Sequence, residues 1–378
     1  MIRFGIECES IEIDMWGVAR AVRQLLTELA SRPELQNEFR VYLYYKNRLP
    51  DWEFLNSPIF TKVRVPVPFF PHRFFPIYQF LLLPLRLWWD RLDAMFWPNY
   101  MLPLFTFTKS IIMTTDDVFV EMRSKAIPVR YRIAYLMYAQ YAAFRGSKLM
   151  TISDTSKKEI LRMYPEIPDS RIVVNHHAIS ITDVSPAFAP VPYPYILYIG
   201  QTFPRRHAKE TMLAFEQIAS EFSDLHLVLI ATDRYSPPQI GRLRDEINGR
   251  LGFERIQWLP FASDTELARY YTHATAVVYV SSREAFGLPP LEAIALGSIP
   301  VVADTDISHE LLGTAGFFVS GKDTYTPEAI AATLRDALTN TGHREYTKGQ
   351  SSRIAQQFSR KNFTDRFLNI VRDVSHAY

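Results

Sequence analysis

The residues best suited to chemistry lie in one short segment, residues 281–297, which reads SSREAFGLPPLEAIALG. It follows an apolar run expected to form a strand, and Pro289 can open a helix because a first helical turn tolerates proline. The free N–H groups and positive dipole end of such a helix suit a phosphate. Glu284 and Glu292 stand before and inside the helix, where carboxylates can accept hydrogen bonds from ligand hydroxyls. An ordinary strand–turn–helix with two solvated glutamates is the alternative interpretation.

The elements around this segment alternate between apolar, β-branched runs and helical patterns, which is typical of βαβ units and parallel sheets. We therefore expect an α/β protein. A helix is predicted over residues 18–30, whose apolar positions share one face. The predicted strands are residues 2–7, 40–45, 63–67, 94–97, 110–114, 148–152 and 171–175 in a first series, and residues 195–199, 225–231, 255–259, 274–280, 299–303 and 316–320 in a second.

A proline-rich break separates the two series. Residues 183–195 read DVSPAFAPVPYPY and have no helical period, as in a semi-rigid linker. We predict a doubly wound domain over residues 1–183, a linker over 184–194 and a second doubly wound domain over 195–359. A last helix, about residues 360–378, is expected to pack back on the first domain. Ligands of such folds bind beyond the carboxyl ends of the strands, so a cleft between the two domains is the expected site.

Composition excludes several classes of function. The length of 378 residues exceeds what one hydrophobic core usually supports, and 48% hydrophobic with 22% charged residues is a globular balance. A net charge of +2 argues against nucleic acid as a partner. Cys8 is the one cysteine, so no disulfide within the chain is expected and a reducing compartment fits. The sequence has no Cys and His cluster with metal-ligand spacing.

Neither a signal peptide nor a membrane span is expected. The N-terminal MIRFGIE lacks a long apolar core, and the most hydrophobic run, residues 74–85, is about half a span and contains two prolines. Aromatic residues concentrate over residues 69–107, interleaved with basic ones. They are either core residues or an aromatic and basic surface that rests on a membrane or accepts a lipid-linked substrate. The residues concerned are Phe69, Phe70, Phe74, Phe75, Trp88, Trp89 and Trp97, with His72, Arg73, Arg86 and Arg91.

The run EAFGLPPLEA at residues 284–293 resembles the E-x7-E signature of the family 4 retaining glycosyltransferases, usually seen as EGFGLPPLEA. Residues 198–215, 255–282 and 300–319 are similar to other segments of that family. The first half is similar through FWPNYMLPL, TTDDV and TISDTSKKEILRMY. The resemblance implies the GT-B fold, in which two Rossmann-like domains face each other across a cleft. This agrees with the fold predicted from the strand pattern.

The resemblance also implies a donor site in the second domain. The family clamps the donor diphosphate with an Arg after the first strand's glycine and a Lys or Arg a few residues later. Here Gln201 occupies the first position and Arg206, beside Arg205, the second. Glu284 would hold the transferred sugar and Glu292 the ribose. The backbone N–H groups that would meet the sugar or the phosphate belong to Phe286, Gly287 and Leu288.

In the first domain the family has a glycine-containing loop before its first helix, through which the backbone approaches the diphosphate. Gly17 is the candidate, with Arg20 one turn on, although Trp16 replaces the family's second glycine. A simple turn glycine is the alternative.

The family's catalytic histidine usually lies in a TIHDL segment, where this chain reads TTDDV. Asp116 or Thr115 takes its place, and Asp116 is our candidate hydrogen-bond acceptor, whereas Asp117 suits a structural cap. His176 and His177 are expected to be structural, and the role of His309 is open.

The implied reaction transfers a hexosyl unit from a UDP- or GDP-linked sugar to a hydroxyl of a glycan or lipid-linked acceptor, with retention, in cell-surface or exopolysaccharide synthesis. Arg206 and the helix after Gly287 would stabilise the leaving diphosphate. No metal and no cofactor besides the donor are expected, although residues 304–306 have the Asp-x-Asp form. The expected location is cytoplasmic, on the inner membrane face if the aromatic segment binds lipid.

Three other functions compete with this prediction. A nucleotide-sugar epimerase would not carry EAFGLPPLEA, and a glycogen-phosphorylase-like enzyme needs a pyridoxal lysine that no motif marks. A catalytically silent, nucleotide-sugar-binding interaction protein is the serious rival, because Trp16, Asp116 and Gln201 all depart from the family pattern.

Overall fold

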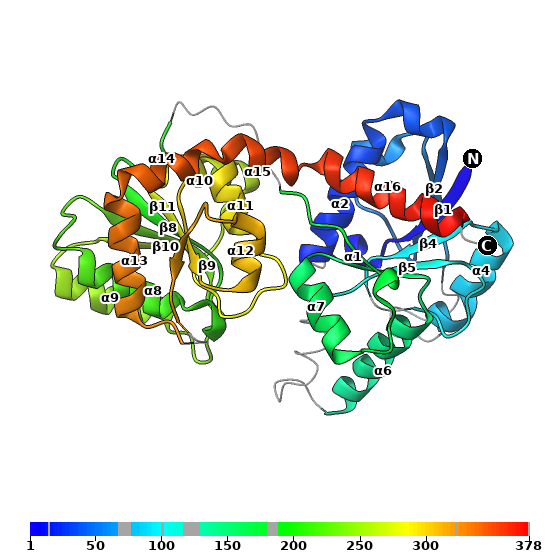
Figure 1. Ribbon diagram of the computed structural model, residues 1–378, viewed down its shortest axis with the longest axis horizontal. Helices are drawn as coiled ribbons and strands as arrows, with labels where there is room; N and C mark the ends of the chain where they lie inside the picture. The colour runs from blue at the N-terminus through cyan, green and yellow to red at the C-terminus, as the bar shows by residue number, and fades with distance from the viewer. Residues whose placement is uncertain are drawn as a thin grey trace. The chain divides into compact units, whose positions relative to one another are not determined.

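The computed structural model describes residues 1–13, 16–66, 77–99, 102–115, 129–179, 188–321 and 324–376. The chain divides into two compact units (Figure 1). The N-terminal unit comprises Met1–Ala178 together with Ser359–Tyr378, and the C-terminal unit comprises Ile179–Phe358. Each unit has its own parallel sheet and its own buried apolar residues.

The N-terminal unit is built on a seven-stranded sheet with the order β3-β2-β1-β4-β5-β6-β7, all of whose pairs are parallel. The register between β1 and β2 runs from Ile2 opposite Phe39 to Glu7 opposite Tyr44. The strands are β1 (Ile2–Glu7), β2 (Phe39–Tyr45), β3 (Phe60–Arg64), β4 (Ala94–Trp97), β5 (Ser110–Met113), β6 (Lys148–Thr151) and β7 (Ile172–Val174).

Helices flank this sheet, and one comes from the far end of the chain. The α-helices are α1 (Glu9–Glu12), α2 (Trp16–Ala30), α4 (Leu83–Asp90), α6 (Val129–Arg145), α7 (Asp154–Met163) and α16 (Arg360–His376). A π-helical turn, η3 (Tyr78–Leu82), leads into α4, and short 3₁₀ turns are η1 (Pro33–Asn37), η2 (Glu53–Asn56) and η4 (Asp169–Arg171).

Helix α16, red in Figure 1, packs beside α2 and against β1, β4 and β5. Its buried Phe367 meets Phe96 and Phe4 edge-on, with ring centroids 4.8 and 6.0 Å apart. Such edge-to-face contacts add to the gain from apolar burial. The Arg372 guanidinium also donates to the Glu38 carboxylate at 2.6 and 2.9 Å. The last helix is therefore part of the N-terminal core.

The C-terminal unit has a six-stranded parallel sheet with the order β10-β9-β8-β11-β12-β13. Its strand order reverses between β8 and β11, which makes this pair the topological switch point of a Rossmann-like sheet. The strands are β8 (Tyr195–Gln201), β9 (His226–Thr232), β10 (Ile256–Leu259), β11 (Ala276–Tyr279), β12 (Pro300–Ala303) and β13 (Phe317–Val319).

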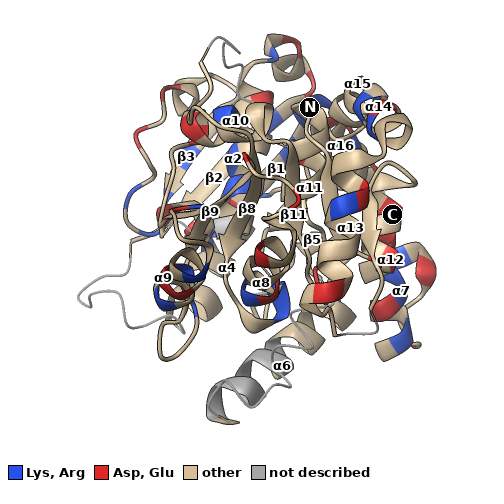
Figure 2. Ribbon diagram, turned by 90° about the vertical axis from the view of Figure 1, so that its left-hand side faces the viewer, with Lys and Arg blue, Asp and Glu red and all other residues tan. Residues whose placement is uncertain are grey.

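Helices α8 to α12 of this unit alternate with its strands, and α13, α14 and α15 follow the last strand. On α8, α9 and α13 acidic and basic residues lie side by side (Figure 2), and Arg250 of α9 pairs with Glu216 of α8. The elements are α8 (Ala208–Ile218), α9 (Ile240–Leu251), α10 (Asp264–His273), α11 (Leu288–Ala295), α12 (Asp306–Leu312), α13 (Pro327–Thr339), α14 (Thr341–Gly349), α15 (Ser351–Gln357) and the 3₁₀ turn η5 (Pro204–Arg206).

The predicted α/β class and all thirteen predicted strands are confirmed, and twelve of the strands begin and end within two residues of the prediction. The exception is the strand predicted over residues 63–67, which forms three residues earlier as β3. The predicted range reads VRVPV and contains Pro66, which cannot donate to a strand ladder, so pairing ends before this proline. The last bond on this edge runs from Val65 N to Tyr45 O, at 2.8 Å.

The aromatic segment of residues 69–107 divides between core and surface. Trp97 is buried, whereas Trp88 and Trp89 on α4 are exposed, so neither sequence interpretation holds for all of them. The rest of the segment's named aromatics, with His72 and Arg73, lie outside the described residues. Across the part of the chain that the structure describes, every helix is too short or too polar to cross a membrane.

Candidate functional site

The candidate site lies at the carboxyl ends of β8 and β11, where the C-terminal sheet changes direction. The connection after β8 runs through η5 into α8, and the connection after β11 runs into α11. These two connections are joined, because Ser282 N donates to Arg205 O at 2.9 Å and Ser282 Oγ lies 3.3 Å from the same oxygen. The switch point therefore brings together two segments far apart in the sequence.

The Glu284 carboxylate is the centre of a charged cluster. Its Oε1 accepts hydrogen bonds from Arg205 Nη1 at 2.6 Å, Arg206 Nε at 2.8 Å and Ser281 Oγ at 3.0 Å. Arg206 Nη2 lies 3.4 Å from Oε2. Two guanidinium groups and one carboxylate leave the cluster with one positive charge.

The protonation states in the cluster follow from burial and charge. Burial opposes ionisation of Glu284, but Arg206 and Arg205 outweigh it and hold the pKa of this carboxyl below its ordinary value. Burial and then the charge of Glu284 raise the pKa of Tyr279 well above its ordinary value. The Arg206 guanidinium lies 5.4 Å from the centre of the Tyr279 ring. At neutral pH the cluster therefore holds an ionised Glu284, two cationic arginines and a neutral phenol.

Two glycines shape the backbone around this cluster. Gly200 has φ +123°, and a Cβ there would lie 3.0 Å from Arg206 Nη1. Gly287 has φ +112° and is the residue from which α11 starts. Both conformations are strained for residues with a side chain, so glycine is required at these two positions.

A pocket opens between the connection after β11 and helix α12. Its lining includes the predicted residues Glu284, Phe286 and Gly287, and the N-terminus of α11 borders it. Phe286 is buried and packs edge-on against Phe358, with ring centroids 6.0 Å apart. The other lining residues are Tyr279, Ser281, Pro290, Thr305, Ile307, Ser308, Leu311 and Leu312.

Glu292 lies inside the second turn of α11 and is buried. The interpretation of both glutamates as solvated surface residues is therefore wrong. Leu288 is the first residue of α11, one residue after the Gly287 turn. The structure thus gathers Arg206 and Glu284 in the charged cluster, with Phe286, Gly287 and Leu288 in the adjoining turn.

Gln201 stands at the end of β8, and its hydrogen-bond partner is a residue that was not predicted to belong to the site. Arg234, which follows β9, donates from Nε to Gln201 Oε1 at 3.2 Å. Its backbone N donates to Thr202 Oγ1 at 3.0 Å, and Thr202 Oγ1 lies 3.3 Å from Asp233 Oδ1. The clue in the sequence was the position of Arg234, just beyond a predicted strand adjacent to the first one.

Asp233 holds the Arg234 loop in place. Its Oδ2 accepts from the backbone N of Gln239 at 2.8 Å and of Ile240 at 2.9 Å, which caps the start of α9. Burial works against ionisation of Asp233, but the hydrogen bonds from Ile240, Tyr235 and Gln239 lower its pKa overall. The Arg234 side chain therefore extends from a well-anchored loop and is itself exposed.

The Asp-x-Asp of residues 304–306 has local partners. His309 Nε2 lies 2.7 Å from Asp304 Oδ1, and its ring stacks on Phe318 with centroids 4.2 Å apart. Thr305 caps α12 by accepting from Ser308 N, and Asp306 is in the first turn of that helix. Asp304 therefore has a local partner in His309, and Asp306 lies at the positive end of the α12 dipole.

In the N-terminal unit, Gly17 lies in the first turn of α2 instead of the loop expected before the first helix. A Cβ there would meet no atom within 4 Å, so packing does not require glycine. The candidate Asp116 and its neighbour Asp117 lie outside the described residues. Arg20 is on α2 beside His177, whose pKa is lowered to about 4 by burial and then by the Arg20 charge.

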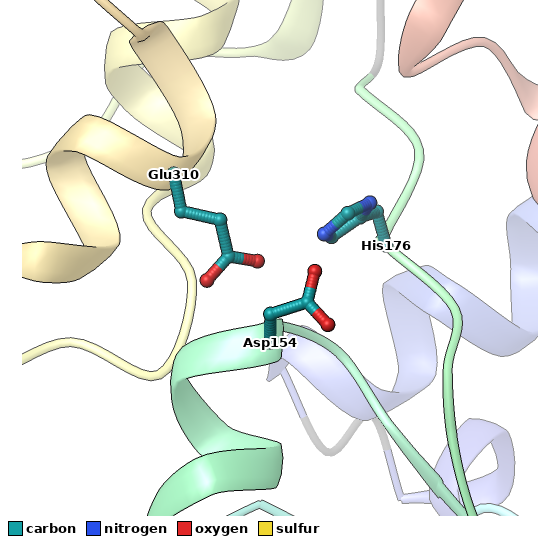
Figure 3. A group of neighbouring side chains, drawn as sticks. All are labelled: Asp154, His176 and Glu310. Atoms are coloured by element: carbon teal, nitrogen blue, oxygen red, sulfur yellow. The ribbon is translucent and has the colours of Figure 1, made fainter.

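His176 follows β7 and faces Asp154, the first residue of α7 (Figure 3). A ring nitrogen of His176 and a carboxylate oxygen of Asp154 lie within 4.8 Å of one another. Glu310, the third side chain in Figure 3, belongs to α12 of the C-terminal unit.

Comparisons with known proteins point to the same family as the sequence motifs of this site. Residues 184–353 match the model of the protein family Glycosyl transferases group 1. The O-antigen chain mannosyltransferase B of Escherichia coli is 28% identical over 285 residues, which are 72% of this chain and 72% of that protein.

Two solved structures are similar over nearly the whole chain. The glycosyltransferase from Rickettsia africae ESF-5 has a TM-score of 0.72 at 14% identity and covers 100% of this chain and 99% of that one. The Anabaena protein Alr3699/HepE in complex with UDP and glucose has a TM-score of 0.70 at 14% identity and covers 99% and 100%. Together with the two Rossmann-like sheets, these findings show that the chain has the GT-B fold and that its C-terminal unit belongs to the group 1 glycosyltransferases of family 4.

Proposed function

We propose that this chain is a retaining, metal-independent hexosyltransferase that moves a sugar from a nucleoside diphosphate to a hydroxyl of a cell-surface glycan or its lipid-linked precursor. The observation that carries the proposal is the Arg205–Arg206–Glu284 cluster beside the N-terminus of α11. The name of the Escherichia coli relative favours mannose as the transferred sugar and an O-antigen-like chain as the acceptor. The Anabaena complex supports a nucleotide sugar as donor.

The donor diphosphate requires more positive charge than the cluster offers. Each phosphate carries about one negative charge, whereas Glu284 already neutralises one of the two arginines. We propose that Arg234 supplies the missing cation. Gln201 occupies the position where the family has an arginine, and the Arg234 guanidinium lies beside it. The α11 N-terminus adds the partial positive charge of its dipole.

Within this proposal Glu284 accepts hydrogen bonds from the transferred sugar and Glu292 from the ribose. The N–H groups of Phe286, Gly287 and Leu288 contact the sugar or the phosphate. Arg206 stabilises the charge that develops on the leaving diphosphate, whose oxygen takes the acceptor's proton, so electrostatic stabilisation is the main catalytic contribution. Burial opposes the charge on Arg206, but the ionised Glu284 carboxylate that accepts its hydrogen bonds favours that charge and the Arg206 pKa is raised overall, so Arg206 stays cationic.

The assignment of domains is part of the same proposal. The C-terminal unit binds the donor and the N-terminal unit binds the acceptor, with Gly17 and Asp116 as its contributions. Cys8 is buried and unpaired, which fits a reducing cytoplasm, where nucleotide sugars are available.

A donor panel with purified full-length chain tests the proposal. We expect binding of one nucleoside diphosphate sugar among GDP-mannose, UDP-glucose and ADP-glucose, and release of the nucleoside diphosphate when a glycan acceptor is present. Binding without any release, with acceptors of several linkages, would support the silent binding protein instead. Product with inverted anomeric configuration would refute retention.

A further inference from the structure

Helix α4 carries apolar side chains on its outer side as well as on its inner side. Leu83 and Leu87 are buried in the N-terminal core, whereas Leu85, Trp88 and Trp89 point away from it and are exposed. Trp88 is 63% exposed and Trp89 76%. Exposed apolar side chains that lie together usually mark an interaction site, so the outer side of α4 calls for a partner.

The loop before β5 extends this apolar face. Phe105 is 71% exposed and Phe107 85%. Two surface hollows meet here and share Phe107 and Thr108: one is lined by α4 residues, the other by residues of the loop and of α6. The Tyr141 hydroxyl of α6 donates to Leu104 O, which ties the loop to the helix. We call Leu85, Trp88, Trp89, Leu104, Phe105 and Phe107 the aromatic surface.

Cations line both hollows of the aromatic surface. Arg91 lines the first hollow, and Lys109 and Arg145 line the second, while neither lining includes an acidic residue. The Asp90 carboxylate is buried beneath α4, where it accepts from Tyr44 Oη at 2.8 Å and Arg86 Nε at 2.7 Å. The described part of this surface therefore combines exposed aromatic rings with positive charge.

We propose that the aromatic surface docks reversibly on an anionic lipid bilayer. Indole and phenyl rings partition into the headgroup region, and nearby cations gain from anionic lipid. Since every described helix is too short or too polar to span a membrane, attachment through this surface is peripheral. The proposal concerns the N-terminal unit alone and does not depend on the chain being an active transferase.

Charge argues against a second copy of the chain as the occupant. A twofold dimer through this surface would place the same patch on both sides, so that Arg91, Lys109 and Arg145 would meet like charges. A bilayer that contains acidic lipids instead offers apolar depth for the rings and negative charge for the cations.

Vesicle co-sedimentation of the full chain tests the proposal. We expect binding to vesicles of 70% phosphatidylcholine and 30% phosphatidylglycerol at low salt, and weaker binding to pure phosphatidylcholine or at high salt, because counterions screen the cations. The double variant Phe105→Ser/Phe107→Ser should bind about ten-fold less or worse. The matched control is Phe188→Ser/Phe253→Ser, which removes two exposed rings from the C-terminal unit and should bind like the wild type.

Tryptophan fluorescence adds a readout of depth. Brominated lipids should quench the emission of the wild type, and Trp88→Phe/Trp89→Phe should lose most of this quenching while it still co-sediments. Equal sedimentation of the Phe105→Ser/Phe107→Ser variant and the wild type would overturn the proposal. So would a concentration-dependent dimer in analytical ultracentrifugation that the same variant abolishes, because the surface would then be a contact between copies.

Discussion

Glu284 joins two arginines and a serine, so its carboxylate serves both the local structure and the proposed sugar contact. Alanine at this position would leave Arg205 and Arg206 without their shared counter-ion, and the cost of unpaired, half-buried charges would add to any loss of catalysis. The amide of glutamine keeps an acceptor oxygen and the volume of the side chain. The neutral isostere is therefore the informative substitution.

For Glu284→Gln we expect kcat/KM to fall by about 100-fold or more, the scale of one pre-organised polar contact. The melting temperature should also fall, though less than for alanine, because the amide keeps an acceptor oxygen but no longer neutralises Arg205 and Arg206. The lowered pKa of Glu284 means that its contribution is complete above about pH 4.5 and is lost only as pH falls further. The wild-type rate should therefore not change between pH 5.5 and 8 on account of this group. Glu216→Gln, at a surface ion pair with Arg250, is the control and should keep full activity.

Arg234 can be tested by exchanging it with its partner. Arg234→Gln should weaken the binding of a nucleoside diphosphate about ten-fold or more, because it removes a charged hydrogen-bond donor. The binding of a bare nucleoside should hardly change. Adding Gln201→Arg to this variant should restore much of the affinity. The measurement is titration calorimetry with both ligands. Equal weakening of both ligands, or no rescue by the exchange, would show that Arg234 does not contact the phosphates; Arg242→Gln on α9 is the control.

The end of β1 carries a buried acid that the proposed function does not use. Glu7 Oε1 accepts from Glu9 N at 2.8 Å, and Lys46 lies over the Tyr78 ring at 4.5 Å. Burial, and then the charge of Glu9, raise the pKa of Glu7 to about 8. At neutral pH the folded chain therefore holds Glu7 as a neutral carboxylic acid, at the edge of the N-terminal sheet where the strands end.

This shift predicts how stability depends on pH. Between pH 4.5 and 8 the unfolded chain has lost the Glu7 proton while the folded chain keeps it, so rising pH lowers the free energy of unfolding across this window. Glu7→Gln removes the effect and should be more stable than the wild type by about 1–3 kcal/mol at pH 9, with little difference at pH 4.5. Denaturant unfolding at several pH values measures it. Parallel stability curves for the two proteins would contradict the neutral acid.

The N-terminal unit is built from both ends of the chain, Met1–Ala178 and Ser359–Tyr378. Phe367→Ala should therefore destabilise a core in which its ring partners Phe4 and Phe96 lie 363 and 271 positions earlier, by about 3–5 kcal/mol for a fully buried ring. Hydrogen-exchange mass spectrometry should show lost protection in β1, β4 and β5 and unchanged protection in β8 and β9. Phe215→Ala, at a fully buried site of the C-terminal unit, should give the reverse pattern.

Metal dependence is a property of the complete reaction. Because Arg206, Arg234 and the α11 N-terminus are proposed to meet the diphosphate charge, turnover should persist in EDTA at about the rate seen without it. The measurement is a steady-state assay with and without chelator, followed by addition of Mg²⁺ or Mn²⁺. A strict requirement for either ion would direct attention to Asp304 and Asp306.

Much of this architecture was predictable from local patterns. Strand runs, the helix over residues 18–30 and the turn at Gly287 depend on neighbours in the sequence, so periodicity and turn chemistry identify them. The same holds for Glu284 and Arg206, which short motifs mark in the C-terminal unit. The misplaced third strand shows the limit of this reasoning, since proline and an edge position decided where pairing ended.

Contacts between distant residues depend on strand order, which no local pattern contains. Glu284 meets Arg205 and Arg206 across 79 and 78 positions because β8 and β11 are neighbours at the switch point. Arg234 reaches Gln201 because β9 pairs with β8 in a register that sets Thr232 opposite Gln201. Likewise, composition could not separate the buried Trp97 from the exposed Trp88 and Trp89. Folding assigns each side chain to core or surface through the packing of whole elements, and only the three-dimensional arrangement contains that information.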